Sequence, residues 1–257
     1  MKQIRSIPLL KGEGGAKRRV RGKVNVLPTL IIFISIFVLP ASLHAQSLAD
    51  IPTDILKDQP KIWTSPFRIK KSDAKWLIPF ATGTAALIAS DHAVSEEVQE
   101  TPVLISPSHR VSNLGSGVAL AAASMGIYGV GKLTHKSHAA ETGILAGEAV
   151  IDASIVTGVL KVAFNRERPD KPMGSGSFWG GGHSFPSGHA AATWSFATVI
   201  ARRYRDKPLV GISAYGVATA VSFARVGGSN HYPSDVLVGA AVGTLIGRFV
   251  LRHRSHD

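Results

Sequence analysis

Six ionisable side chains between residues 161 and 235 are of the types that bind and attack a tetrahedral oxyanion. They comprise three cations, two imidazoles and one carboxylate, namely Lys161, Arg168, Arg225, His189, His231 and Asp235. A guanidinium offers a planar fork of donors to two oxygens, and an ammonium offers a point charge. An imidazole can act as a nucleophile or move a proton near neutral pH. The set suits a site that holds an oxyanion with positive charge and attacks it with an imidazole.

The first two cations stand at the end of an apolar stretch. A helix over 141–164 would leave Lys161 in its last turn, and Pro169 would favour an extended chain at Arg168. Cations in such a place can also simply offset the helix dipole, and alone these two would more often do only that. The three residues between the helix and Arg168 have no assigned role and are expected to be solvated: Asn165, Arg166 and Glu167.

A Pro-Ser-Gly-His turn follows a glycine-rich loop. Ser187 is a suitable N-cap for a helix that starts near His189, and Gly188 lets backbone N–H groups approach a ligand closely. Helix N-termini bind phosphate through free N–H groups and the helix dipole. His189 at this edge can protonate a leaving oxygen, although an ordinary capped helix start has the same sequence. His183 in the preceding loop is expected to be a loop histidine rather than a catalyst.

The last group combines a cation, an imidazole and a carboxylate. Asp235 follows His231 by four residues, across Pro233 and Ser234, where a helix is expected to begin. A carboxylate there can accept a hydrogen bond from one imidazole nitrogen, which leaves the other nitrogen as a neutral nucleophile. Asp235 could equally cap the helix or offset its dipole, so the residue alone leaves both roles open.

Together the three motifs resemble the type 2 phosphatidic acid phosphatase (PAP2) family, which shares its site with bacterial class A acid phosphatases and vanadium haloperoxidases. The family pattern is Lys-x6-Arg-Pro, then Pro-Ser-Gly-His, then Ser-Arg-x5-His-x3-Asp. It is met at Lys161, Arg168, Pro169, Pro186, Ser187, Gly188, His189, Arg225, His231 and Asp235. One position differs, because Ala224 stands where the family has Ser and cannot make a hydroxyl hydrogen bond.

The resemblance implies an all-α, six-helix bundle of the PAP2/acid phosphatase type over residues 76–251. It implies that His231 is the nucleophile, Asp235 its orienting acid and His189 the general acid. The residues that would hold the phosphoryl oxygens are Lys161, Arg168, Ser187, Gly188 and Arg225. The implied activity is hydrolysis of a phosphate monoester or diphosphate ester, of a lipid or of a small molecule, through a phosphohistidine. Neither a metal nor another cofactor is expected, because Lys and Arg supply the positive charge.

Two other functions are compatible with the same motifs. A vanadate-dependent haloperoxidase would use the site for vanadate, but six helices with short connections leave little of the extra scaffold of that family. A non-catalytic phosphate- or lipid-binding envelope protein would need neither histidine. The complete set of His189, His231 and Asp235 favours the enzyme.

Six apolar stretches must position these residues, and none alternates with period two, so each is expected to be a helix. They are Trp76–Ser90, Val111–Leu133, Glu141–Phe164, His189–Arg202, Leu209–Phe223 and Asp235–Leu251. Abundant Gly and Ala favour close helix packing. If successive helices are antiparallel, the third and fifth end, and the fourth and sixth begin, at one face of the bundle. The motif residues, which lie in the connections 165–188 and 224–234, should then converge there.

The beginning of the chain resembles a bacterial export signal. Residues 1–23 hold eight Lys or Arg and one Glu, and the apolar run 26–39 is followed by a cleavage site after Ala45. An uncleaved N-terminal anchor is the alternative, although 14 apolar residues are few for a membrane span. Residues 46–75 are expected to form a polar arm with one short helix at 54–57, and residues 252–257 a tail.

Charge and cysteine content exclude several classes. Residues 1–23 account for +7 of the formal charge of +12, so a nucleic-acid-binding surface is not expected. The absence of Cys excludes disulfides, thiolate catalysis and Cys-ligated zinc. We expect an exported, membrane-associated protein of the cell envelope with its site facing the periplasm. The short stretches, and the cost of Glu148 and Asp152 in lipid, leave a soluble periplasmic bundle and a multi-pass inner-membrane bundle both open.

Overall fold

The computed structural model describes residues 47–101, 105–170 and 176–254, which form α-helices joined by short connections, with no strand among them. The expected export signal in residues 1–45 lies outside the described residues. The helices are α2 (Ile51–Thr64), α3 (Ala74–Gln99), α4 (Ile105–Asn113), α5 (Gly117–Leu133), α6 (Ser137–Phe164), α7 (Gly188–Arg203), α8 (Pro208–Gly227) and α9 (Pro233–Arg254). Two 3₁₀ turns, η1 (Ser65–Arg68) and η2 (Lys71–Asp73), join α2 to α3. Each of the six predicted stretches is helical, which confirms the all-α prediction.

Three predicted boundaries differ in ways that matter for the fold. The expected tail at 252–257 begins later, because α9 continues through Arg254, whose side chain pairs with Glu148 and Asp58. The stretch 111–133 is divided between α4 and α5, which meet at an angle of 45°. Ser116 starts the second helix, because its hydroxyl accepts a hydrogen bond from the backbone N–H of Ala119 at 3.2 Å. Helix α3 does not end at residue 90 as expected but continues through nine more residues, because the carboxylate of Asp91 is buried against the bundle rather than solvated.

The polar arm is more ordered than its composition suggests. Helix α2 covers 14 residues, whereas a helix only at 54–57 was expected. Pro52 lies in the first turn, where its missing N–H costs no hydrogen bond. One side of α2 is buried through Ile51 and Asp58, so contact with the bundle stabilises a helix that its sequence alone would support weakly.

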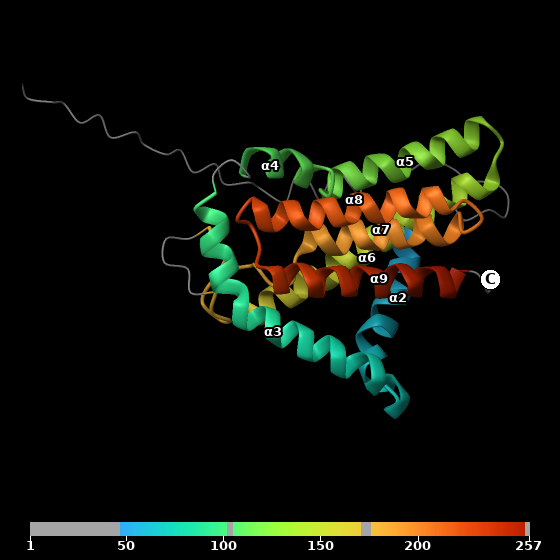
Figure 1. Ribbon diagram of the computed structural model, residues 1–257. Helices are drawn as coiled ribbons and strands as arrows, with labels where there is room; N and C mark the ends of the chain where they lie inside the picture. The colour runs from blue at the N-terminus through green and yellow to red at the C-terminus, as the bar shows by residue number, and fades with distance from the viewer. Residues whose placement is uncertain (1–46, 102–104, 171–175, 255–257) are drawn as a thin grey trace, which may run out of the picture. The chain divides into compact units, whose positions relative to one another are not determined.

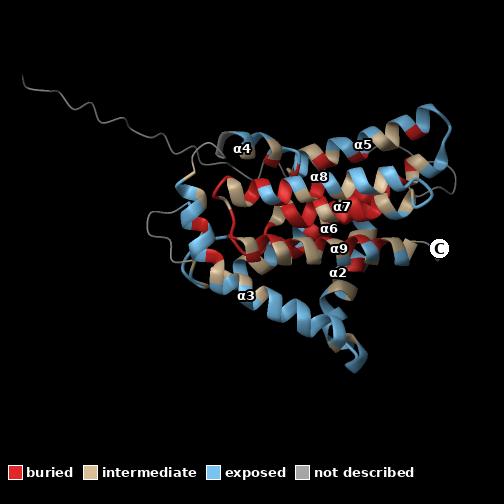
Figure 2. Ribbon diagram, viewed as in Figure 1, coloured by how far each residue is buried: buried red, intermediate tan, exposed pale blue. Residues whose placement is uncertain are grey.

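Helices α6, α7 and α9 form the centre of the bundle and run side by side in Figure 1, with α8 packed on α7. Burial is concentrated on α6 and α7, whereas α3 and α5 are mostly exposed (Figure 2). The main core cluster is built largely from small and branched aliphatic residues: Leu145, Ala146, Ala149, Ala153, Val156, Ala191, Val199, Ile200, Ile246 and Val250. Small side chains here allow neighbouring helix backbones to come close.

Three glycines at four-residue spacing bring α9 against α7. A Cβ atom at Gly239 would lie 2.5 Å from the carbonyl oxygen of Ser187, and one at Gly247 would lie 2.7 Å from that of Ser195. A Cβ atom at Gly243, between these two glycines, would clash with the carbonyl oxygen of Ala191. This contact sets the distance between the start of α7 and the start of α9, which are the two places where the Pro-Ser-Gly-His turn and Asp235 lie.

The outer helices expose apolar side chains. On α3, Trp76, Ile78 and Phe80 are exposed, and on α8 so are Leu209 and Phe223. By length and composition, four described helices could cross a membrane, namely α3 together with η2, α6, α8 and α9, and the bent pair α4–α5 would make a fifth. Exposed apolar faces of this length are what a lipid bilayer would cover.

Candidate active site

The motif residues lie at one end of the bundle, as the antiparallel arrangement predicts. Lys161 is in the last turn of α6 and Arg225 in the last turn of α8, whereas Asp235 is in the first turn of α9. Ser187 caps α7, and its backbone N–H donates to the carbonyl oxygen of Asp235 at 2.9 Å. Residues that are far apart in the sequence therefore meet where two helices end and two begin.

His231 and Asp235 form a buried pair. Nδ1 of His231 lies 3.4 Å from Oδ2 of Asp235, and the Asp235 side chain is fully buried. The same oxygen accepts hydrogen bonds from the backbone N–H of Tyr232 at 3.0 Å and from the hydroxyl of Ser184. Because the carboxylate faces Nδ1, it favours the tautomer in which Nδ1 carries the proton and Nε2 carries a free lone pair.

Burial keeps His231 neutral. It lowers the pKa of the imidazole from 6.5 to about 3, and the charges of Lys161 and Arg225 act in the same direction. The hydrogen bond with Asp235 opposes this shift without overcoming it. At neutral pH the side chain is therefore an uncharged imidazole, which is the nucleophilic form.

Arg166 is the main correction to the sequence analysis, which expected it to be solvated. Its side chain is 2% exposed, and Nη1 donates to Oδ1 of Asp235 at 2.6 Å. Nη2 donates to Oδ2 of Asp91 on α3 at 2.7 Å. The guanidinium also lies 4.4 Å from the ring centroid of Tyr232 and 4.7 Å from that of Phe178. The described parts of this connection, residues 165–170 and 176–187, thus lie across the end of the bundle, so a residue in a polar linker becomes buried.

Lys161 and Arg225 are held in place by neighbours at the same end of the bundle. Nζ of Lys161 donates to the carbonyl oxygen of His183 at 2.6 Å and to that of Ser184 at 3.3 Å. Nη1 of Arg225 donates to the hydroxyl of Ser112 on α4 at 2.6 Å, whereas its buried Nε has no hydrogen-bond partner among the described residues. Arg225 therefore has a hydroxyl partner, Ser112, although residue 224 is alanine and not the serine of the family pattern.

His189 stands beside these cations at the start of α7. Burial, together with the positive charges of Arg225, Lys161 and Arg168, lowers the pKa of its imidazole from 6.5 to about 4. Arg168 is half-buried, and its charge affects the same imidazole as the charges of Lys161 and Arg225. An anion bound there would be surrounded by positive charge, and by neutralising that charge it would raise the pKa of His189.

A pocket of about 270 Å³ opens next to His189 and Lys161. Its other lining residues are small, namely Gly115, Gly117, Ser154, Thr157, Gly158, Gly188 and Ala192. Gly188 and His189 are the first two residues of α7, so their backbone N–H groups have no partner within the helix. The helix N-terminus, the cations and the pocket together form a site for an anionic group.

Comparison with known proteins agrees with this arrangement. A family model described as the PAP2 superfamily matches residues 142–256, a range that contains every predicted site residue. The carboxyl-terminal part of the chain, which holds the site, is therefore similar to the PAP2 superfamily. Its similarity to a curated lipid A 1-phosphatase from Porphyromonas gingivalis is 27% identity over 85% of this chain and 48% of that protein. A decaprenylphosphoryl-5-phosphoribose phosphatase from Mycobacterium tuberculosis is 31% identical over 42% of this chain and 58% of its own length.

The PAP2 fold is also supported by a solved structure. The crystal structure of a transmembrane PAP2-type phosphatidylglycerolphosphate phosphatase from Bacillus subtilis superposes with a TM-score of 0.57 and 23% identity. The match covers 73% of this chain and 98% of that one, so the common fold extends well beyond the range of the family model. This chain spans about half the length of the curated PAP2 relatives that it matches.

Four neighbours of the site were not predicted from the sequence, namely Asp91, Ser112, Arg166 and Ser184. Asp91 directly follows an apolar stretch, and a carboxylate in that place is a signal for a buried charge if the helix continues. Ser112 lies at the start of the predicted stretch 111–133 and Ser184 lies in a polar connection, and a serine in either place gives no such signal. The contact of Ser112 with Arg225 depends on the packing of α4 on α8. The contacts of Ser184 with His231 and Asp235 depend on how the connection before α7 folds over the helix ends.

Proposed function

We propose that this chain is a phosphatase that hydrolyses a phosphate or diphosphate ester of a lipid through a phosphohistidine intermediate, without a catalytic metal ion. The observation that carries the proposal is the buried pair of His231 and Asp235, oriented by Arg166 and facing a group of cations. A neutral imidazole beside fixed positive charge is suited to attack on a phosphoryl group, whose negative charge would repel an anionic nucleophile.

In the first step, Nε2 of His231 attacks the phosphorus atom in line with the bond to the leaving alcohol. A P–N bond forms, the P–O bond breaks, and His189 gives its proton to the departing oxygen. The imidazolium that results on His231 is stabilised by Asp235 at Nδ1. Lys161, Arg168 and Arg225, with the N-terminal N–H groups of α7, hold the three non-bridging oxygens.

In the second step, water attacks the phosphohistidine. His189, now neutral, takes a proton from the water, the P–N bond breaks, and inorganic phosphate leaves. His231 returns to its neutral form with the proton on Nδ1. Lys and Arg supply all the positive charge that this sequence needs, so a divalent cation has no required role in it.

Two observations favour a lipid as the carrier of the phosphate. The lipid A 1-phosphatase and the decaprenylphosphoryl-5-phosphoribose phosphatase are both named for phosphates on lipids. In addition, the site lies at the end of a bundle whose outer helices expose apolar side chains, so a substrate anchored in a bilayer could reach it.

We further propose that the bundle lies in the bacterial inner membrane with the site facing the periplasm. At the end opposite the site, the last turn of α7 and the turn to α8 carry four cations, namely Arg202, Arg203, Arg205 and Lys207. At the site end, the connection 228–232 has no Lys or Arg, and the connection 165–187 has three, of which Arg166 is paired with Asp91 and Asp235. Excess positive charge in short connections marks the cytoplasmic side of a membrane protein. This charge difference supports the predicted periplasmic site. The route needs α7, a helix of 16 residues that is not among the candidate spans named above, to cross as well. A leader cleaved after Ala45 does not fit this route, because it would start the chain on the periplasmic side.

The test of the activity is direct. Purified protein in detergent should release phosphate from lipid phosphates, assayed as phosphatidate, phosphatidylglycerol phosphate and undecaprenyl diphosphate, and from a soluble aryl phosphate for comparison. His231→Ala should abolish turnover, and rapid denaturation of the wild type during turnover of a radiolabelled ester should trap phosphohistidine. Undiminished turnover by the folded alanine variant would rule out the proposed nucleophile.

A further inference from the structure

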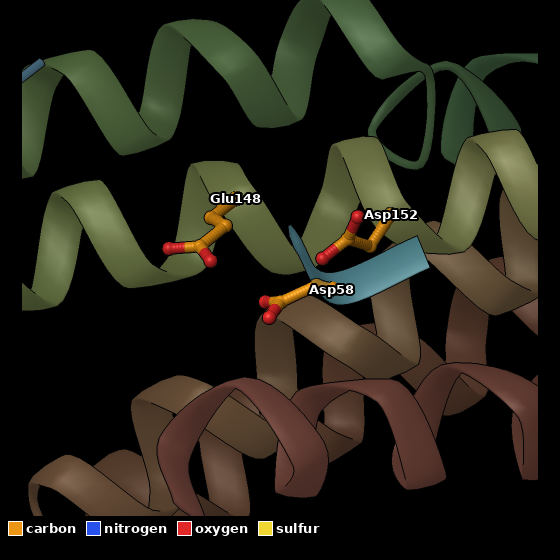
Figure 3. Close-up of side chains that lie close together, drawn as sticks. All are labelled: Asp58, Glu148 and Asp152. Atoms are coloured by element: carbon orange, nitrogen blue, oxygen red, sulfur yellow. The ribbon is translucent and has the colours of Figure 1, made fainter. Parts of the chain in front are cut away.

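A second cluster of ionisable groups lies away from the active site. Asp58 of α2, Glu148 and Asp152 of α6 are all buried, and one carboxylate oxygen from each lies within 4.8 Å of the others. Figure 3 shows Glu148 and Asp152 on successive turns of α6, on the side where Asp58 approaches from α2. Lys161 is nine residues beyond Asp152 along α6, a distance of about 14 Å, so this cluster is separate from the catalytic end.

One arginine only partly compensates the three acids. Nη2 of Arg254, in the last turn of α9, donates to Oε1 of Glu148 at 2.5 Å and to Oδ2 of Asp58 at 3.1 Å. Asp152 has an uncharged partner, because its Oδ1 accepts from the amide of Gln59 at 2.8 Å. Three ionised carboxylates and one guanidinium carry a net charge of −2. A buried net charge of this size is unfavourable unless protons or a cation neutralise it.

Two oxygens in the cluster lack any partner. Oδ1 of Asp58 and Oδ2 of Asp152 are buried and accept no hydrogen bond from the described residues. Both side chains are completely inaccessible to solvent. A buried carboxylate oxygen without a donor is rare in native proteins, because it loses its hydration without replacement. One such oxygen on α2 and one on α6 are therefore available to coordinate a cation.

We propose that Asp58, Glu148 and Asp152 form a structural site for a divalent cation, with Ca²⁺ as the preferred ion. Hard divalent cations select carboxylate oxygens. Ca–O bonds are about 2.3–2.6 Å long. Three oxygens that all lie within 4.8 Å of one another are close enough together to bind one such ion. Mg²⁺ has shorter bonds and demands near-ideal octahedral geometry, so it should bind more weakly.

The bound ion would fasten α2 to the bundle. Asp58 is one of two buried residues of α2, and the other two ligands belong to the central helix α6. Removal of the ion should loosen α2 first, whereas the active-site pair of His231 and Asp235 is at the other end. The site is therefore distinct from catalysis, and the chemistry proposed above does not pass through this ion.

The experiment uses the full-length protein in detergent, stripped with a chelator and then titrated with Ca²⁺ and, separately, with Mg²⁺ by calorimetry. We expect one Ca²⁺ per chain, a higher thermal midpoint with Ca²⁺, and a weaker effect of Mg²⁺. Asp152→Asn and Glu148→Gln should weaken Ca²⁺ binding at least tenfold. Glu141→Gln is the matched control, because Glu141 is also on α6 but pairs with Arg203 at 2.9 Å, away from the cluster.

A luminescent probe tests the position of the ion. Nε1 of Trp63 donates to Gln59 at 3.0 Å, and Gln59 in turn contacts Asp152, so the indole is close to the proposed ion. Tb³⁺, which replaces Ca²⁺ in oxygen sites, should emit when this indole is excited. Trp63→Phe should remove most of the emission while Ca²⁺ binding by calorimetry persists. Emission that is unchanged in Trp63→Phe would place the ion elsewhere and overturn the assignment.

Binding and activity measurements also test whether the cluster holds a divalent cation. No saturable binding of Ca²⁺ or Mg²⁺ by the stripped wild-type protein would show that protons neutralise the cluster, and would overturn the site whether or not the α6 variants fold. Asp58→Asn, on the peripheral helix α2, provides a ligand variant outside the core.

Activity lost in EDTA together with a lower thermal midpoint, and restored by Ca²⁺, would indicate a structural ion. Inactivity of the Ca²⁺-loaded protein would instead count against the proposed phosphatase.

Discussion

Arg166 donates from Nη1 to Oδ1 of Asp235 at 2.6 Å, and both side chains are buried. The other terminal nitrogen of the same guanidinium pairs with Asp91, so one cation joins two carboxylates from α3 and α9. Because Asp235 also faces Nδ1 of His231, the orientation of the imidazole depends on a residue that touches neither the imidazole nor the proposed substrate site. Arg166 is therefore a positioning residue.

The Arg166 contact predicts a loss of both stability and turnover. Arg166→Met leaves two buried carboxylates without a cation, and breaking a buried pair in this way costs about 3–5 kcal/mol. Arg166→Lys should keep the fold but lose the fork, so kcat should fall while KM changes little. Thermal unfolding and steady-state kinetics on an aryl phosphate measure both effects. Arg202→Lys, at an exposed position on α7, is the control. If kcat of Arg166→Lys equals that of the wild type, the residue acts on stability alone.

Arg168 should behave differently, because its charge acts directly on the anion site. Arg168→Lys keeps the charge but loses the bidentate fork, and loss of one transition-state donor costs on the order of 10²–10³ in kcat. Orthovanadate, which adopts a phosphoryl-like geometry, should inhibit the wild type and inhibit the variant less. The thermal midpoint should not change. Unaltered kcat and vanadate sensitivity would mean that Arg168 does not contact the oxyanion.

The depressed histidine pKa values predict acid sensitivity of the fold. Burial lowers the pKa of His231 to about 3 and that of His189 to about 4 in the folded protein, against 6.5 for an unperturbed imidazole. The unfolded chain therefore binds protons first as the pH falls below about 6.5, and stability is lost from there toward pH 3. One pKa unit corresponds to about 1.4 kcal/mol. His231→Gln should flatten the pH dependence of the thermal midpoint, whereas a profile parallel to that of the wild type would show that His231 does not contribute.

Close packing of α7 on α9 predicts a strong effect of a single methyl group. Gly243→Ala places a Cβ against the backbone of Ala191, which cannot move without shifting α7. Overpacking of this kind typically costs about 1–3 kcal/mol. The matched control is Gly126→Ala on α5, where a Cβ would meet nothing within 4 Å and helix propensity should improve. Equal thermal midpoints for the two variants would contradict the close contact between α7 and α9.

The proposed orientation can be tested because the natural chain contains no cysteine. Glu100→Cys marks the site end, since the neighbouring Gln99 donates to the carbonyl oxygen of Pro169 at 2.9 Å. Arg205→Cys marks the opposite end, in the turn between α7 and α8. A maleimide that cannot cross the inner membrane should label the first variant in cells with a permeabilised outer membrane, and the second only after lysis. The reverse pattern would place the site in the cytoplasm, and N-terminal sequencing would decide whether the leader is cleaved.

The sequence by itself determined the helices, their order and the residues with chemical potential. Apolar stretches without period-two alternation have one stable form in a chain rich in Gly and Ala, so α6 to α9 were predictable from composition. If successive helices are antiparallel, the ends of α6 and α8 lie beside the starts of α7 and α9. Lys161, His189, Arg225 and His231 are at or next to those helix ends, so they were expected to meet at one end of the bundle.

Only the tertiary structure decided which polar residues are buried. Arg166 and Asp91 lie in polar surroundings along the chain, yet each is satisfied inside the protein by the other. Likewise, Asp58 of the polar arm joins Glu148 and Asp152 only because α2 packs on α6. Burial of a charge depends on a partner that is distant in sequence. Periodicity and spacing report the local chain alone, so they cannot identify such a partner before the chain is folded.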